Sequence, residues 1–280
     1  MKYMKLGDFE LTIVSDGTFW LDGGAMFGVV PKALWNRLNP ADELNRIRLS
    51  LSCLLIKTPE HVVIVDTGIG GDFKERFLDL YGVERGDGLP GALHELGIAP
   101  EDIDYVINTH LHFDHCGGNT KKHGKTFIPT FSRARYIIQE LEWDDAHHTN
   151  ERTKASYMKR HFEPIEAASQ LMLVDGDHEV IPGITVRHTN GHTRGHQSVL
   201  IESGGKKAMY LGDLIPTTAH IKIPYIMGYD LFPVDILKKK KEILDMAARE
   251  HWLLIFEHDP RVSFGYVQEQ NGQMVFQRAD

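Results

Sequence analysis

The segment Thr109-His110-Leu111-His112-Phe113-Asp114-His115 places four potential metal ligands within six residues. It directly follows residues 104–108, an apolar run that we interpret as a short strand. In an extended segment, residues i and i+2 share a face, so His110 and His112 can reach the same ion. Once the chain turns, the aspartate and the last histidine point elsewhere and can hold a second ion. The spacing therefore favours two metal ions over one.

Three later segments each supply one further ligand at the end of a predicted strand. They are Gly191-His192, Leu211-Gly212-Asp213 and Phe256-Glu257-His258. Strand ends converge on one edge of an α/β sheet, which is the usual place for a site. Zinc takes about four ligands, and catalytic sites keep one position for water. We therefore expect these side chains to complete the ligand set of the first cluster.

Strand and helix patterns alternate through the rest of the chain, which favours an α/β fold. In the first half, a strand at 9–14 and a hairpin of 51–58 and 61–66 precede helical patterns at 72–80 and 90–97. The second half shows strands at 170–174, 178–188, 197–202, 207–211 and 252–256, and a helix that begins at Pro233. We expect a single domain, 1–280, with two α/β halves of roughly 1–165 and 166–280.

Composition excludes several classes of protein. Apolar residues make up 42% of the 280 and charged residues 25%, as in ordinary soluble domains. The formal net charge of −8 argues against nucleic acid as a partner. Two cysteines are too few for a disulfide framework. The chain shows no signal-like or membrane-spanning apolar stretch, so we expect a cytoplasmic protein without a membrane partner.

Two polar segments stand apart from this pattern. Residues 141–162 are charged and helical in pattern, and we interpret them as an exposed insertion or a lid. Lys238–Lys241 is a run of four lysines on the last helix, which predicts a solvated face.

The ligand pattern resembles the metallo-β-lactamase-fold hydrolases, with Val65-Asp66-Thr67-Gly68 as a further upstream motif. The resemblance implies a four-layered αβ/βα sandwich of two β-sheets flanked by helices. It implies that His110, His112 and His192 bind one metal ion and that Asp114, His115 and His258 bind the other, with Asp213 bridging. Asp66 would be an outer residue that orients the ligand loop. Zinc suits this His/Asp set, and Fe, Mn or Co fit it as well.

A closer resemblance, to the YtnP-type quorum-quenching lactonases, is carried by residues 21–32, 109–115 and 213–220. It implies hydrolysis of N-acyl-homoserine lactones. In a different branch of acyl-homoserine lactonases, a substrate-facing tyrosine stands three residues after the bridging aspartate, where this chain has Pro216. We therefore take His220 as the candidate substrate contact. Arg194 also departs from the pattern, since many members have proline there.

The expected reaction is opening of a lactone ester ring by a metal-bridging hydroxide, because two divalent ions acidify a shared water. We assign Asp114 to carry the proton to the leaving oxygen. An apolar set could surround an acyl chain or, equally, pack in the core or at a homodimer interface: Met26, Phe27, Val30, Ile226, Met227, Tyr229 and Phe232. The alternative is a phosphotriesterase or arylesterase that resembles methyl parathion hydrolase, using the same hydroxide on phosphorus or an aryl ester.

Overall fold

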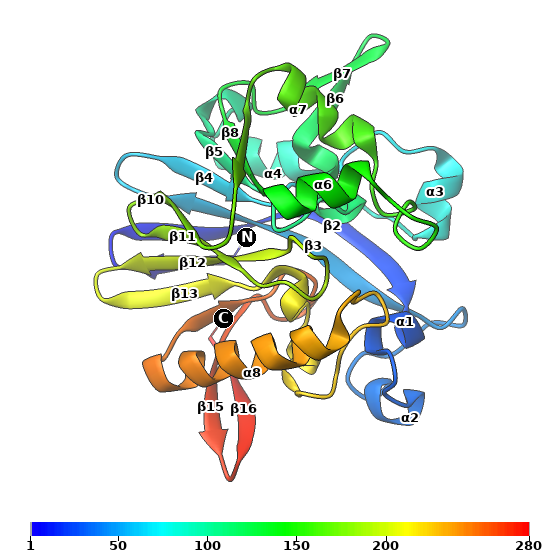
Figure 1. Ribbon diagram of the computed structural model, residues 1–280, viewed down its shortest axis with the longest axis vertical. Helices are drawn as coiled ribbons and strands as arrows, with labels where there is room; N and C mark the ends of the chain where they lie inside the picture. The colour runs from blue at the N-terminus through cyan, green and yellow to red at the C-terminus, as the bar shows by residue number, and fades with distance from the viewer. Residues whose placement is uncertain (1, 280) are drawn as a thin grey trace.

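Two seven-stranded sheets form the centre of the computed structural model, which describes residues 2–279 (Figure 1). The first sheet has the order β1-β2-β3-β4-β5-β8-β9, and the second runs β10 to β16 in sequence order. The strands of the first sheet are β1 (Lys2–Leu6), β2 (Phe9–Asp22), β3 (Arg46–Lys57), β4 (Val62–Val65), β5 (Tyr105–Ile107), β8 (Arg135–Gln139) and β9 (Leu171–Val174). Those of the second are β10 (His178–Ile181), β11 (Ile184–His188), β12 (Gln197–Ser203), β13 (Lys206–Tyr210), β14 (Leu253–Ile255), β15 (Phe264–Gln270) and β16 (Gln273–Arg278). β6 (Thr120–His123) and β7 (Thr126–Pro129) form a separate hairpin.

Helices cover the outer faces of both sheets (Figure 1). The helices are α1 (Gly23–Phe27), α2 (Lys32–Trp35), α3 (Glu75–Leu80), α4 (Gly88–Glu95), α5 (Phe113–Cys116), α6 (Glu140–His147), α7 (Glu163–Ala167) and α8 (Pro233–Glu250). One apolar core lies between the sheets, a second joins the first sheet to α4, α6 and α7, and a third joins the second sheet to α8. These layers confirm the predicted four-layered αβ/βα sandwich.

The strand order brings the ligand segments together. β4 pairs with β5 in parallel, and β13 pairs with β14 in parallel. The carboxyl ends of each parallel pair therefore meet at one sheet edge. Asp66 follows β4, the segment 108–115 follows β5, Asp213 follows β13 and His258 follows β14.

Three sequence interpretations need correction or refinement. The predicted strand 178–188 is the antiparallel pair β10 and β11, because Pro182 lacks an N–H for the ladder and Gly183 takes a φ of 83°. The lysine run is not wholly solvated: Lys240 is fully buried, and its ammonium donates to the backbone carbonyls of Lys222 and Tyr225. The chain passes from the first sheet to the second between β9 and β10, later than residue 165.

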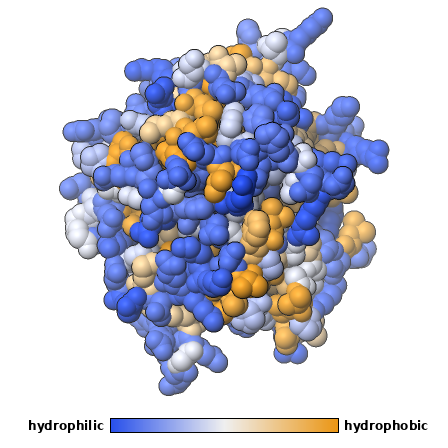
Figure 2. All heavy atoms as spheres, in the orientation of Figure 1, coloured by the Kyte–Doolittle hydropathy of each residue, from blue (hydrophilic) through white to orange (hydrophobic). Residues whose placement is uncertain are grey.

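The surface view in Figure 2 shows apolar side chains as several separate patches among polar ones on this face. Among residues 2–279, no helix combines the length and the apolar character needed to span a bilayer.

Candidate metal centre

The structure gathers all seven predicted ligands at the shared sheet edge, in two clusters. We call His110, His112 and His192 site 1, and Asp114, His115 and His258 site 2. Within each site, one ligand atom of every residue lies within 4.8 Å of the others. In site 1, His112 and His192 come from different segments of the chain and approach closely. Nε2 of His192 is 3.1 Å from Nδ1 of His112.

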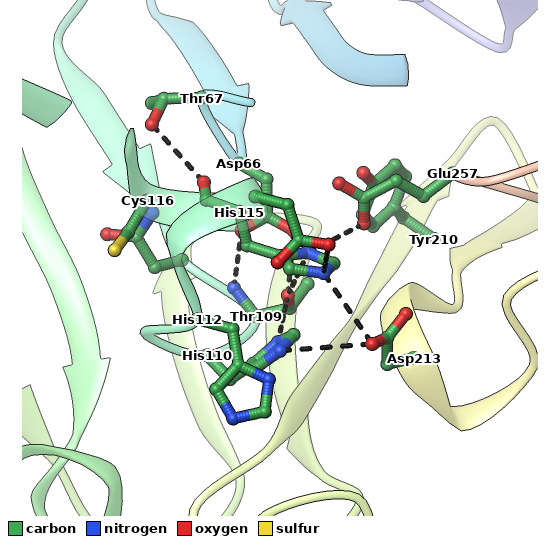
Figure 3. Close-up of polar contacts among 12 residues, drawn as sticks. Asp66, Thr67, Thr109, His110, His112, His115, Cys116, Tyr210, Asp213 and Glu257 are labelled. Carbon is green, nitrogen blue, oxygen red and sulfur yellow. Dashed lines mark hydrogen bonds and ion pairs between the residues drawn. The ribbon is translucent and has the colours of Figure 1, made fainter. Parts of the chain in front are cut away.

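Asp213 lies between the two sites. Its Oδ2 is 3.1 Å from Nε2 of His192, and its Oδ1 is 3.2 Å from Nε2 of His258. Oδ2 also faces His110 and His115, at 3.9 and 3.6 Å (Figure 3). One carboxylate therefore presents an oxygen to each site, which is the arrangement a bridging ligand needs.

The donor set fits divalent cations. Nε2 of His110 and Oδ1 of Asp213 are buried polar atoms without a hydrogen-bond partner in the described chain, and buried orphans of this kind call for an ion or water. Burial and the neighbouring rings of His115 and His112 hold the pKa of His110 well below its usual range, which keeps its imidazole neutral and able to ligate. Burial opposes the charge of Asp213, yet the imidazoles of His192, His115 and His258 hold its pKa well below the usual range.

Outer carboxylates orient one histidine in each site. Asp66 accepts from the backbone N–H and the hydroxyl of Thr109, both at 2.7 Å, and lies 3.1 Å from Nδ1 of His115. Asp230 lies 2.9 Å from Nδ1 of His192. A carboxylate that accepts a hydrogen bond from Nδ1 leaves Nε2 free to ligate and fixes the plane of the ring. Asp66 thus lies where an orienting residue would stand, and Asp230 holds the corresponding position in site 1.

Glu257 is a second buried carboxylate beside His115. Its Oε2 is 3.1 Å from Nδ1 of the ring (Figure 3). Burial raises the pKa of Glu257 to about 7, against the opposing effect of His115. Nδ1 of His115 is therefore flanked by two carboxylates, Asp66 and Glu257.

A cavity of about 340 Å³ opens above the two sites, within the size range of ligand pockets. His112, Asp114, His192, Asp213 and His258 form its polar floor. The apolar wall includes Leu21, Met26, Phe113, Met227 and Leu231, with Tyr81 and Tyr229 beside them. The arrangement suits a substrate that has a reactive polar group and an apolar tail.

Three of the seven residues predicted to contact an acyl chain line this cavity: Met26, Met227 and Tyr229. The other four do not. Phe27 and Val30 are buried in the core around α1 and α2, Ile226 packs against the core under α8, and Phe232 is exposed just before α8.

The structure does not support His220 as a substrate contact. Its ring stacks on Phe27 at 4.6 Å, its Nε2 lies 2.8 Å from the carbonyl oxygen of Met26, and its Nδ1 bonds the hydroxyl of Thr217. His220 is 1% exposed and does not line the cavity. Both ring nitrogens are used inside the protein, so we assign it a packing role.

Part of the segment 141–162, predicted to be an exposed insertion or a lid, lines the cavity. Arg152, Thr153, Ala155 and Ser156 line the cavity from the turns after α6. The ring of Tyr157 packs edge-on against His112, with centroids 5.0 Å apart. The insertion therefore contributes wall to the cavity and contact to a predicted ligand.

Sequence reasoning missed Asp230, Glu142 and Arg152. Asp230 had a usable signal, because it is a carboxylate among apolar residues of a predicted pocket segment. Glu142 had none, since it stands in a strongly charged helix, where glutamate is normally solvated.

Comparison with known proteins gives a match to the Metallo-beta-lactamase superfamily over residues 47–258. An N-acyl homoserine lactonase of a Bacillus species is 31% identical over 253 residues, which is 85% of this chain and 89% of the relative.

Solved structures agree in fold. A probable metal-dependent hydrolase from Staphylococcus aureus has a TM-score of 0.92 and 33% identity, covering 99% of each chain. An N-acyl homoserine lactone hydrolase, solved with the product N-hexanoyl-L-homoserine at its catalytic metal centre, has a TM-score of 0.71 and 26% identity. That similarity covers 92% of this chain and 95% of the other.

Proposed function

Because the chain belongs to the metallo-β-lactamase superfamily, we propose that it is a dinuclear metal-dependent hydrolase that opens the ester ring of N-acyl-homoserine lactones. The observation that carries the proposal is Asp213, which presents one oxygen to each of two ligand clusters beneath an apolar cavity. The lactonase relative from Bacillus and the product-bound hydrolase of similar fold support the substrate class.

Two divalent ions held by sites 1 and 2, with zinc as the first choice, would generate a nucleophile from water at neutral pH and polarise the lactone carbonyl. The protein supplies the geometry around them. Asp66 and Asp230 hold the rings of His115 and His192, and Asp213 fixes the spacing of the two sites.

Asp114 carries the proton in this proposal. It lines the cavity, and its Oδ2 lies 3.6 Å from Nε2 of His115 and 3.8 Å from Nε2 of His258. When water adds to the carbonyl carbon, its proton passes to the carboxylate. The ring C–O bond then breaks, and the proton moves to the leaving oxygen, which gives a hydroxyl and a carboxylic acid; the acid releases its remaining proton to solvent and becomes a carboxylate.

Met26, Met227 and Tyr229 would contact the acyl chain. Methionine side chains are flexible and adapt to apolar groups of different shape. We expect tolerance for several chain lengths within the limit that a cavity of about 340 Å³ sets.

The test is a pH-stat screen of acyl-homoserine lactones, aryl esters and phosphotriesters, with and without a chelator. We expect chelator-sensitive opening of the lactones as the fastest reaction, and a large loss of rate in Asp114→Asn protein that retains its metals. Faster turnover of phosphotriesters or aryl esters would instead support the alternative hydrolase. Undiminished activity of the variant would remove Asp114 from the mechanism.

A cytoplasmic location and a homodimer stay predictions from the sequence. Light scattering on the purified protein tests the second.

A further inference from the structure

Glu142 is a buried carboxylate of α6 whose partners come from elsewhere in the chain. The residue is 0% exposed and lies in the first turn of a helix that carries four other acidic or histidine side chains, Glu140, Asp144, Asp145 and His147. Oε1 accepts from the backbone N–H of Leu111 at 2.9 Å and from the hydroxyl of Tyr157 at 3.0 Å. Oε2 accepts from the hydroxyl of Thr193 at 2.5 Å. Burying a charged group in this way is costly unless it is well hydrogen-bonded.

Two of the three partners of Glu142 are chain neighbours of the site 1 ligands. Leu111 stands between His110 and His112, and Thr193 follows His192 directly. These two ligand loops are about eighty residues apart in sequence, and Glu142 is a partner that both of them share. Glu142 binds one loop with each of its oxygens.

Two further contacts fix the second loop on α6. Arg194 pairs with Asp144 and Asp145, in both cases with Nη2 2.6 Å from a carboxylate oxygen. A Cβ at Gly195 would lie 2.2 Å from the backbone nitrogen of Glu142, so only glycine allows this approach. The arginine that departs from the family's usual proline therefore belongs to the same contact.

The first loop is held from the same side. The backbone N–H of Phe113 donates to the carbonyl of Ser156 at 2.9 Å, and Tyr157 packs against the ring of His112. Residues 141–162 therefore contact both loops that carry site 1.

Site 2 shares the segment 109–115 with site 1, but its histidines are held by other partners. His115 is held by Asp66 and Glu257, which follow β4 and β14, and Nδ1 of His258 donates to the carbonyl of Ser50 in β3. None of these contacts involves Glu142.

We propose that Glu142 is a positioning residue for site 1, through which the 141–162 segment holds the two ligand loops at the spacing that a metal ion requires. The proposal rests on the dinuclear centre proposed above. It predicts that site 1 binds its metal ion more weakly without Glu142, while the metal affinity of site 2 is unchanged. The insertion is then part of the metal centre as well as its cover.

The experiment compares the wild type with Glu142→Leu, Glu142→Gln and Glu140→Ala, using zinc titration in metal-buffered solution and the visible spectrum of the cobalt-substituted protein. Glutamine can keep all three contacts, because its oxygen accepts from Leu111 and Tyr157 and its amide donates to Thr193. Glu140 is exposed on the same helix and serves as the matched control. Circular dichroism checks that each variant is folded.

In Glu142→Leu we expect one metal to bind as in the wild type and the other about 10- to 100-fold more weakly, the range typical of outer-residue changes. Glu142→Gln and Glu140→Ala should bind both metals as the wild type does. Two unchanged affinities in folded Glu142→Leu, or an equal loss at both sites, would overturn the proposal. A wild type that binds no metal would instead refute the proposed function.

If Glu142→Leu does not fold, Thr193→Val provides the second test. It removes one donor to Glu142 and keeps the charge. We expect a weaker but still selective loss at one metal site, and unchanged affinities at both sites would contradict the proposal.

Discussion

Asp230 binds two groups with one carboxylate: Nδ1 of His192, at 2.9 Å, and the backbone N–H of Met227, also at 2.9 Å. His192 is a proposed metal ligand and Met227 lines the cavity. The backbone N–H of Leu231 also donates to the carbonyl of His192, at 3.1 Å. The wall of the cavity and a ligand of site 1 are therefore one hydrogen-bonded unit.

Asp230→Ala should therefore affect metal binding and substrate binding together. Without the carboxylate, the ring of His192 loses the hydrogen bond that orients it, and the backbone N–H of Met227 loses its acceptor. We expect about tenfold weaker zinc binding at one site and a higher KM at saturating zinc. Titration and steady-state kinetics measure the two effects. Asp245→Ala, an exposed change on α8, is the control. If neither the dissociation constant for zinc nor KM rises, the contact is dispensable.

Lys240 is buried although it stands in a run of four lysines on α8. Its Nζ donates to the carbonyls of Lys222 at 3.0 Å, Ile223 at 3.4 Å and Tyr225 at 2.7 Å. Lys238, two residues earlier, is exposed and pairs with Asp235. Because successive helical residues are about 100° apart, one lysine of the run faces the core.

Lys240→Met should lower the free energy of unfolding by about 1–3 kcal/mol, because buried carbonyls lose their donor. Lys238→Met should change it by less than about 0.5 kcal/mol. Urea unfolding followed by circular dichroism compares the two. Equal stabilities would mean that other donors, such as water, replace the ammonium.

The sequence carried enough information to group the seven proposed ligands, because each stands in a short motif at the end of a strand. The i, i+2 spacing of His110 and His112 is a local property of the backbone, and the α/β pattern places strand ends together. The fold class could also be predicted from the sequence, since hydrophobic patterning is a local property as well.

Features that depend on tertiary packing could not be predicted. Glu142 and Lys240 stand in charged helices, and their burial depends on segments outside those helices that pack against them. His220 is the opposite case. A histidine after the Asp213 motif resembled a substrate contact, yet stacking on Phe27 takes its ring into the core.

His161 should make stability depend on pH. It is 2% exposed, and burial together with nearby Arg160 lowers its pKa to about 3. The unfolded chain takes up this proton near pH 6.5, while the folded chain does not. Acidification below about pH 6.5 therefore favours unfolding, by up to about 1.4 kcal/mol per pH unit.

Replacement by phenylalanine removes this contribution. The free energy of unfolding of His161→Phe should fall less steeply than that of the wild type between about pH 6.5 and 5. The exposed His123→Phe change provides the control. Denaturant curves at several pH values measure the slopes, and parallel slopes for wild type and His161→Phe would contradict the assignment.

Arg152 joins the insertion to the opposite wall of the cavity. Its Nη2 donates to the carbonyl of Gly228 at 2.6 Å, and the N–H of Gly228 donates to the carbonyl of Ala25 in α1. The contact closes one side of the cavity without touching a proposed ligand, so it should stabilise bound substrate and transition state equally. Arg152→Ala should weaken substrate binding by about 0.5–1.5 kcal/mol. This corresponds to a rise in KM of roughly two- to tenfold, with little change in kcat. Steady-state kinetics on a long-chain lactone, with the exposed Arg133→Ala change as control, measure both constants. A fall in kcat at constant KM would mean that Arg152 acts in the transition state instead.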